Sequence, residues 1–229
     1  MADVEIQLKG VRKVYGKGEA AFEALKGIDL EVQKGEYIAI TGRSGSGKST
    51  LMHVIGCLDS LTDGKYYLEG QDVSKLSDDD LARIRNRKIG FVFQAFNLLP
   101  HLNLLEQVMV PMYYAGITGN KAKNKAMEAL DRVGLSSKWH RHATQISGGE
   151  MQRVAIARAI VMNPGLLLAD EPTGNLDTAT SDQVMDIFQE LNKSGSTVVL
   201  VTHEIDVAYR AKRIVHLKDG LIEYEESKA

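Results

Sequence analysis

The feature that most constrains the fold of this chain is a short glycine-rich segment near its N-terminus. The pattern G-x-x-x-x-G-K-[ST] is matched by Gly42, Arg43, Ser44, Gly45, Ser46, Gly47, Lys48 and Ser49, and Thr50 follows them. Residues 37–40 before it are apolar and residues 49–58 after it favour a helix. Glycines let backbone N–H groups turn toward phosphate oxygens, and the helix N-terminus adds roughly half a positive charge. The segment, called the P-loop below, therefore predicts a site for a nucleotide's phosphates. Lys48 would contact the β- and γ-phosphates and Ser49 would bind Mg²⁺.

The charge balance and the apolar runs exclude several classes of partner. Lys and Arg total 28 and Asp and Glu total 30, for a net charge of −2, so we predict no nucleic-acid partner. No run approaches the roughly 18 apolar residues that span a bilayer, and the start of the chain lacks a signal-peptide pattern. The single cysteine, Cys57, fits a reducing compartment. We therefore expect a soluble protein whose membrane role, if it has one, comes through a partner.

Short apolar runs separated by helical stretches predict an α/β fold with a parallel-sheet core. The core strands are expected at residues 37–40, 89–93, 166–169 and 197–201. Alternating residues at 4–8 and 28–32 predict a small antiparallel β lobe, and residues 103–133 predict helices with a break at 116–120. Residues 212–225 predict two strands joined at Lys218-Asp219-Gly220. We expect one domain over residues 1–229. Its β lobe spans roughly 1–35 and 62–75, its inserted helical lobe roughly 96–160, and its core the remainder.

The apolar strand that starts at residue 166 is predicted to end in two acidic residues. A buried strand delivers Asp170 and Glu171 to the carboxyl edge of the sheet, where ligands of α/β proteins bind. Because successive strand residues point in opposite directions, we expect separate roles for the two acids. Asp170 is predicted to bind Mg²⁺, and Glu171 to activate the attacking water as a general base. Capping of the strand end is the alternative interpretation.

Two more polar residues lie just past core strands. Gln94 follows residues 89–93 and could bind Mg²⁺ or orient water through its side-chain oxygen. His203 follows residues 197–201 and could donate a hydrogen bond to the γ-phosphate. Each alone would be an ordinary hydrogen-bonding residue at a strand end. Together with the P-loop and the two acids they predict one convergent catalytic site.

A second glycine-containing segment precedes a helical run. Ser147 and Glu150 have the S-x-x-E spacing of a capping box, which is a sufficient local reason for both. A capping box does not explain the adjacent Gly148 and Gly149, which cost backbone entropy and expose N–H groups at a positive helix end. We therefore predict a second phosphate contact at this segment, called the signature segment below.

The order of these motifs resembles the nucleotide-binding domains of ABC transporters. The P-loop, Gln94, the signature segment, Asp170-Glu171 and His203 occur in that family's order over nearly the whole chain. The resemblance implies an α/β P-loop NTPase with a RecA-like core that binds ATP and Mg²⁺ and hydrolyses ATP. It also implies a head-to-tail homodimer in which the signature segment of one protomer covers ATP on the P-loop of the other.

Further residues carry expectations from the same resemblance. Asn175, Leu176 and Asp177 resemble the family's dimer-interface loop, and Tyr15 resembles the aromatic residue that stacks on adenine. Ile146 and Glu150 depart from the commonest signature sequence, Leu-Ser-Gly-Gly-Gln. That departure leaves the contact near the nucleotide's sugar open.

Residues 93–100 are similar to the MacB and LolD branch of the family, which serves exporters and lipoprotein release. The resemblance implies a membrane permease docked between Gln94 and Leu102, which would hold the chain at the cytoplasmic face of the cell membrane. A core of the helical lobe is an equal alternative for these apolar residues. A transmembrane-signalling ATPase of the FtsE type is the alternative function.

Overall fold

The computed structural model describes residues 3–228, and its centre is a six-stranded sheet that is parallel except at one edge. The strand order is β10-β9-β3-β8-β7-β6, and β10 pairs antiparallel with β9. These strands span Tyr37–Thr41 (β3), Ile89–Phe93 (β6), Leu166–Asp170 (β7), Thr197–Val201 (β8), Arg213–Lys218 (β9) and Leu221–Ser227 (β10). All the predicted core strands are present, and the closing hairpin turns at Asp219-Gly220 as predicted. The predicted fold class is confirmed.

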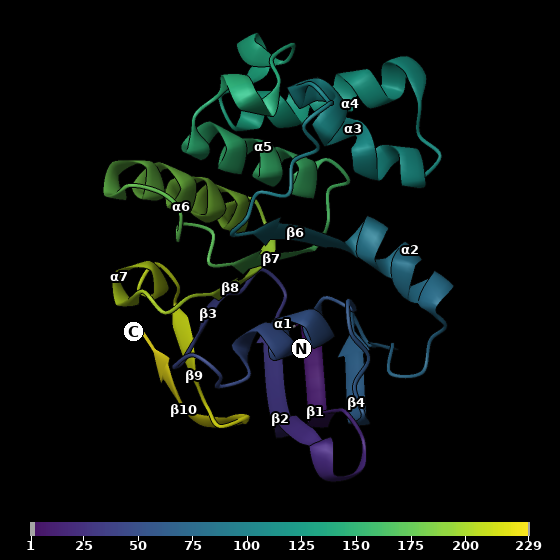
Figure 1. Ribbon diagram of the computed structural model, residues 1–229, viewed down its shortest axis with the longest axis vertical. Coiled ribbons are helices and arrows are strands. Elements are labelled where there is room, and N and C mark those ends of the chain that lie inside the picture. The colour runs from purple at the N-terminus through teal and green to yellow at the C-terminus, as the bar shows by residue number, and fades with distance from the viewer. Residues whose placement is uncertain (1–2, 229) are drawn as a thin grey trace.

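A smaller antiparallel sheet covers one face of the core sheet. Its order is β2-β1-β4-β5, and the strands are Val4–Tyr15 (β1), Phe22–Gln33 (β2), Asp63–Leu68 (β4) and Gln71–Asp72 (β5). A 3₁₀ turn, η1 at Gly18–Ala20, joins β1 to β2. The two sheets and α1 (Lys48–Ile55) share one cluster of buried side chains that includes Ile6, Ile38, Leu51 and Leu166. In Figure 1 this sheet lies below the core strands, with α1 between them.

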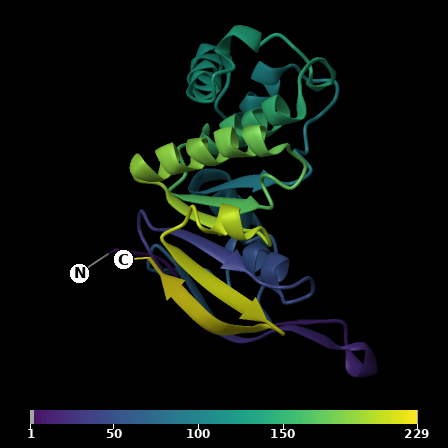
Figure 2. The same cartoon turned by 90° about the vertical axis from the view of Figure 1, so that its left-hand side faces the viewer.

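Helices cover the opposite face of the core sheet. They are α3 (Leu104–Tyr114), α4 (Gly119–Arg132), α5 (Gly148–Ile160) and α6 (Thr178–Lys193). The short elements are α7 (Ile205–Ala208), η2 (Ser136–Lys138) and η3 (Ala143–Gln145). The remaining helix, α2 (Asp78–Lys88), instead packs Ile84 into the cluster shared with the antiparallel sheet. Figure 2 shows α5 and α6 stacked above the sheet, with α3 and α4 beyond them. The α4 helix starts at Gly119, close to the predicted break.

Alternation along the strands separates the two cores. Leu166 and Leu168 face the antiparallel sheet, whereas Leu167 and Ala169 face the helices. Such two-sided burial explains why these strands read as continuous apolar runs. One buried cluster runs from α3 and α4 through α5 and α6 to the sheet, so the lobe boundaries at 1–35, 62–75 and 96–160 remain a proposal. Residues 1, 2 and 229 of the predicted domain lie outside the described residues. Within residues 3–228 no helix has the length and apolar content to cross a membrane.

Candidate nucleotide-binding site

The P-loop joins β3 to α1, as predicted, and two of its glycines are required by its own backbone. Gly42 has φ +153°, and a Cβ there would lie 2.2 Å from the carbonyl oxygen of Leu217. Gly47 has φ +103°, and its Cβ would lie 2.8 Å from the carbonyl oxygen of Ala24. Gly47 is the N-cap of α1 and provides no side-chain cap. The N–H groups of the first turn of α1 therefore have no capping side chain, which leaves them for a ligand.

A cavity of about 620 Å³ opens beside this loop. Its lining combines P-loop residues with side chains from the ends of three other core strands. The predicted residues in it are Gly42, Arg43, Ser44, Gly45, Gly47, Lys48, Ser49, Thr50, Gln94, Asp170, Glu171 and His203. Ser46 is buried and instead holds the loop, because its carbonyl oxygen accepts a hydrogen bond from the N–H of Gly220 at 3.0 Å. The structure thus brings the predicted catalytic residues and the P-loop to one cavity.

The two acids are separated by a backbone turn, and the prediction of two acids within one strand is wrong. β7 ends at Asp170, and Glu171 follows in the left-handed region with φ +46°. A non-glycine residue in that region costs on the order of 1–3 kcal/mol and is concentrated at functional sites. The N–H of Glu171 donates to the carbonyl oxygen of Val201 at 2.8 Å, which fixes the turn against β8.

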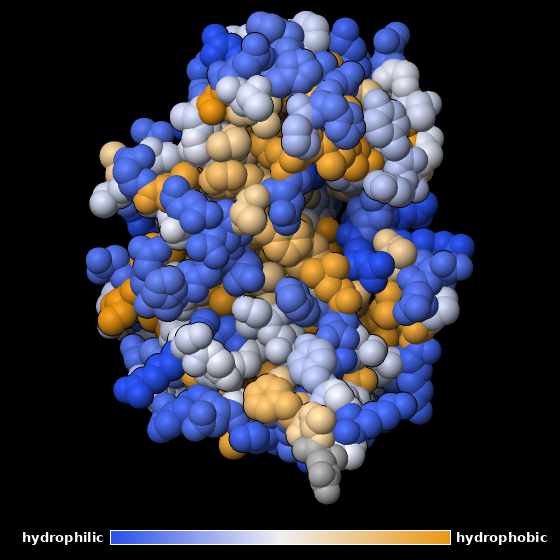
Figure 3. Space-filling view, in the orientation of Figure 1, coloured by the Kyte–Doolittle hydropathy of each residue, from blue (hydrophilic) through white to orange (hydrophobic). Residues whose placement is uncertain are grey.

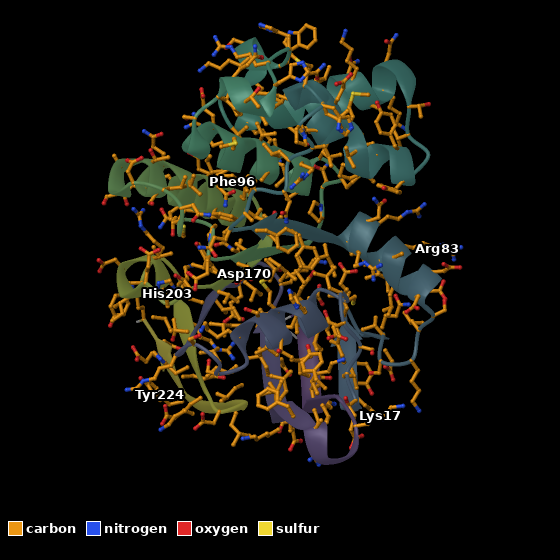
Figure 4. All side chains as sticks on the ribbon, in the orientation of Figure 1. Lys17, Arg83, Phe96, Asp170, His203 and Tyr224 are labelled. Carbon is orange, nitrogen blue, oxygen red and sulfur yellow. The ribbon has the colours of Figure 1, made fainter. Side chains whose placement is uncertain are left out.

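The Glu171 carboxylate is held by the residues that follow β8. Its Oε1 lies 2.7 Å from Nδ1 of His203, and its Oε2 accepts a hydrogen bond from the Thr202 hydroxyl at 3.3 Å. The hydrogen bond and charge of Glu171 raise the pKa of His203. Burial, followed by the charge of Glu171, raises the pKa of Asp170. In Figure 4 Asp170 and His203 lie close together at the end of the core strands. The cavity therefore combines a lysine, a hydroxyl, two carboxylates and an imidazole beside a phosphate-type loop.

Gln94 connects this cavity to the loop before α6. The carbonyl oxygen of Gln94 accepts a hydrogen bond from Nδ2 of Asn175 at 2.9 Å. A Cβ on Gly174 would lie 2.6 Å from Nε2 of Gln94, so this glycine leaves room for the Gln94 side chain. Asp177 has a local role as N-cap of α6, accepting a hydrogen bond from the N–H of Thr180 at 3.1 Å.

The signature segment forms the N-terminus of α5 and lies outside the cavity lining. Ser147 Oγ accepts from the N–H of Glu150 at 3.3 Å, and Glu150 Oε2 accepts from the N–H of Ser147 at 3.0 Å. The predicted capping box is therefore present. The Ser147 hydroxyl is therefore engaged with Glu150 as part of this capping box. The first-turn N–H groups of Gly148 and Gly149 have no helical carbonyl to bond.

These two glycine-containing helix starts, together with the acids at the end of β7, match one family of proteins. The family model described as ABC transporter matches residues 25–174, which is more than half of the chain. The chain belongs to the ABC transporter family. It is an ATP-binding and ATP-hydrolysing cassette of that family, as the motif order predicted.

Individual relatives show which members of the family this cassette resembles. The ABC transporter ATP-binding protein YknY of Bacillus subtilis is 54% identical over 217 residues, which are 95% of this chain and 94% of YknY. The macrolide export ATP-binding/permease protein MacB of Syntrophobacter fumaroxidans is 51% identical over 223 residues. These cover 96% of this chain but 31% of MacB. The predicted resemblance to the MacB branch is confirmed at the level of the cassette.

A solved relative has the same fold. The cassette MJ0796 of Methanocaldococcus jannaschii, in a dimeric post-hydrolysis state bound to ADP and Pi, is 44% identical with a TM-score of 0.89. The alignment covers 97% of this chain and 98% of that one.

Tyr15, a predicted contact of the nucleotide, does not line the cavity, whereas Phe22, which was not predicted, does. The Tyr15 hydroxyl donates to Oδ2 of Asp59 at 2.8 Å, and Lys13 Nζ lies 4.9 Å from the centre of the Tyr15 ring. Phe22, at the start of β2, lines the cavity with 62% of its surface exposed. Its only sequence signal is an aromatic residue at a strand end. Adenine stacking on Tyr15 stays a prediction, and Phe22 is a second aromatic surface at the same site.

Proposed function

We propose that this cassette works as the energy-coupling ATPase of a MacB-type exporter or extractor. Two copies would associate head to tail, so that the signature segment of each covers ATP on the P-loop of the other. The observation that carries this proposal is a glycine that the isolated chain does not need. That glycine is Gly148.

The two signature glycines differ in what surrounds them. A Cβ on Gly149 would lie 2.1 Å from Cγ2 of Thr180, so packing of α5 against α6 requires that glycine. A Cβ on Gly148 would have Leu176 at 3.7 Å and Phe96 at 3.9 Å as its nearest neighbours, which are ordinary contacts. Gly148 has no positive φ either. Close approach by a group outside the chain, such as a phosphate held by a second copy, accounts for this glycine.

Two further facts support the dimer. The ABC cassette MJ0796 is dimeric in its state with ADP and Pi. Asn175 and Asp177 are exposed in this chain, as residues of an interface loop would be before association. The pattern therefore favours a composite site whose second half comes from another protomer.

The cavity residues fit the chemistry of ATP hydrolysis. Glu171 would accept a proton from the attacking water, and His203 would contact the γ-phosphate. Ser49, Gln94 and Asp170 line the cavity and each has a side-chain oxygen, which is the ligand type that Mg²⁺ takes. Within residues 3–228 no group of three His, Cys, Asp or Glu side chains is arranged so that it could hold a metal ion by itself. A shared site suits Mg²⁺, which binds one or two carboxylates plus substrate phosphates. When bound, the ion would offset phosphate charge.

A groove on the far side of Gln94 is our candidate for the permease contact. It has a volume of about 840 Å³ and is lined by parts of α2, β6, α3 and α5. Phe91, Leu99 and Tyr114 give it apolar walls, and Arg83 and Arg87 lie at its edge. Figure 3 shows hydrophobic residues gathered between the upper helices and α2, beside strongly hydrophilic ones.

The segment beside this groove is connected to the signature helix. Phe96 and Asn97 both have left-handed φ angles, and the Arg158 guanidinium donates to their carbonyl oxygens at 2.8 and 2.6 Å. Arg158 belongs to α5, so a permease helix pressing on residues 94–102 would act on the signature helix. Through this permease the cassette would sit at the cytoplasmic face of the membrane.

The dimer is tested with a cassette that binds ATP but hydrolyses it slowly. In the Glu171→Gln protein we expect an ATP-dependent dimer by gel filtration, and adding Ser147→Arg should abolish it. ATP binding by the Ser147→Arg monomer, measured by calorimetry, should stay unchanged. A normal ATP-bound dimer of the double variant would exclude the role of the signature segment in the partner's site.

The permease contact is tested in vesicles that contain the cassette with its co-purifying permease. Leu99→Asp places a charge in the groove, where the Leu99 side chain is exposed. ATP-driven transport of labelled cargo should fall while hydrolysis by the free cassette persists. Leu221→Asp, on β10 and equally exposed, is the matched control. Equal transport by the two variants would place the permease elsewhere.

A further inference from the structure

The signature helix of this chain carries an ion pair that the capping box alone does not need. Oε2 of Glu150 completes the capping box with Ser147, while Oε1 accepts a hydrogen bond from Nζ of Lys138. The Glu150 side chain is only 13% exposed and that of Lys138 is 36% exposed. The hydrogen bond from Lys138, followed by that from Ser147, holds the pKa of Glu150 below its ordinary value. Glu150 is therefore a partly buried carboxylate that forms an ion pair with Lys138.

Lys138 is held in place by a rigid connection. It ends the η2 turn, where its N–H donates to the carbonyl oxygen of the buried Leu135 at 3.0 Å. The next residues bond to the start of α3. Leu105 N–H donates to the carbonyl oxygen of Trp139 at 3.0 Å, and Leu104 N–H to that of Arg141 at 2.8 Å. The lysine is thus presented to Glu150 from a fixed turn rather than from a loose surface loop.

The negative charge of Glu150 lies close to the helix end that would bind ATP in the proposed composite site. Glu150 is the third residue of α5, and the first-turn N–H groups of Gly148 and Gly149, which have no helical carbonyl to bond, lie in the same turn. An uncompensated carboxylate there would repel the triphosphate that these donors are proposed to receive. A glutamine at this position would cap the helix equally well without that charge. This chain therefore has a negative charge at Glu150 that the commonest signature sequence lacks, and that charge must be offset.

We propose that Lys138 is a positioning residue that neutralises Glu150, so that the signature segment can receive the partner's ATP. This inference rests on the proposed head-to-tail dimer. Lys138 acts through Glu150, and its effect should depend on the charge of that residue. A purely structural role predicts the opposite, namely that loss of Lys138 disturbs the turn whichever residue stands at position 150.

The experiment is a double-mutant cycle in the Glu171→Gln protein. The variants are Lys138→Met, Glu150→Gln and the two combined, and the dissociation constant of the ATP-dependent dimer is measured by analytical ultracentrifugation. Lys138→Met should weaken the dimer about tenfold, since a loss of about threefold at each of two symmetric sites multiplies. In the Glu150→Gln background the same substitution should have no effect beyond about twofold.

Controls separate charge from folding. Lys121→Met removes one exposed cation from the same helical region and should leave the dimer as it is. Lys138→Arg should keep the parent affinity. Raising the salt concentration should reduce the effect of Lys138→Met, because screening weakens the repulsion.

Two outcomes overturn the inference and one removes its foundation. Parent-like affinity of Lys138→Met would show that Glu150 needs no neutralisation. An equally weak dimer in the Lys138→Met, Glu150→Gln double variant would assign Lys138 a structural role. If the Glu171→Gln parent itself forms no ATP-dependent dimer, the proposed function fails and the inference falls with it.

Discussion

The P-loop and the signature segment are both glycine-containing helix starts, yet they are built in opposite ways. Gly42 and Gly47 have left-handed φ angles, and a Cβ on either would strike a carbonyl oxygen of the same chain. Gly148 lies in a regular helix, where a Cβ would make only ordinary contacts, and Ser147 caps this helix through its side chain. The P-loop is thus explained within one chain, whereas the signature segment has a feature that one chain does not explain. The difference indicates that the P-loop is a complete phosphate-binding element within one chain, whereas the signature segment needs a second chain to complete its site.

The largest expected effect comes from removing the proposed base on the P-loop side. Glu171→Gln should lower ATP hydrolysis by roughly 10²–10⁴-fold, which is the usual contribution of a general base. It should leave the signature segment able to close over ATP, so a stable dimer accumulates. Phosphate release measures the first effect and gel filtration the second. Hydrolysis at the parent rate would refute the role of Glu171, and Glu190→Gln on α6 controls for charge.

The next largest effect is on ATP affinity, which should depend on the P-loop and not on the signature segment. Lys48→Ala removes a cation that lines the cavity and should weaken ATP binding by roughly 10²-fold or more. Ser147→Arg should change the affinity of the monomer by less than about twofold, since no contact to nucleotide is proposed there within one chain. Calorimetry at a concentration below dimerisation measures both. Unchanged affinity in Lys48→Ala would count against the P-loop as the phosphate site.

Local patterns predicted the P-loop side well because its parts are local. The apolar runs at residues 89–93 and 197–201 are strands with those same bounds, and the residues after them line the cavity. Parallel strands bring their carboxyl ends to one edge, so Gln94 and His203 could be placed together without coordinates. The separation of Asp170 and Glu171 was predicted for the wrong reason. It depends on a left-handed turn that strand alternation does not reveal.

Features that depend on distant packing were not predictable in the same way. Phe22 reaches the cavity because β2 packs beside the P-loop, and its sequence neighbourhood contains no motif. Lys138 meets Glu150 because the η2 turn is bonded to α3, which no spacing rule encodes. Gly148 and Gly149 are indistinguishable in the sequence. They differ in the structure because Thr180 packs against Gly149 and not against Gly148.

The signature glycines give a smaller effect, and it should divide between stability and association. Gly149→Ala forces a methyl group against Thr180 and should lower the free energy of unfolding by about 1–3 kcal/mol. Gly148→Ala should change it by no more than about 0.5 kcal/mol, or raise it slightly through helix propensity. Urea denaturation measures both.

For dimer formation, Gly148 should be the sensitive position, although its substitution hardly changes stability. Gly148→Ala should weaken the ATP-dependent dimer of the Glu171→Gln protein although its fold is intact. If Gly148→Ala dimerises as the parent does, the proposal that a second protomer approaches Gly148 closely is wrong. If Gly149→Ala is as stable as the parent, α6 can yield at Thr180 and the distinction between the two glycines is lost.

The smallest effect concerns pH and distinguishes the two glutamates by their cationic partners. Glu171 pairs with a histidine, and Glu150 pairs with a lysine. The pKa of His203 is raised in the fold. Its pair therefore stabilises fully below the ordinary histidine value near 6.5, and that contribution is lost as pH rises through the raised pKa. The pKa of Glu150 is lowered, so its contribution is present above the ordinary glutamate value and is lost only as pH falls through the lowered pKa.

Of these two pairs, therefore, only the Glu171–His203 pair should change its charge as pH rises above the ordinary histidine value. In the nucleotide-free cassette, an NMR titration of the His203 ring should have its midpoint at lower pH in Glu171→Gln than in the parent. The stability involved is small, since exposed pairs are worth about 0.2–1 kcal/mol, and the His203 side chain is 67% exposed. The spectroscopic midpoint is the sharper test for that reason. Identical midpoints would mean that the Glu171–His203 contact carries no charge coupling, and the contrast between the two glutamates would then rest on geometry alone.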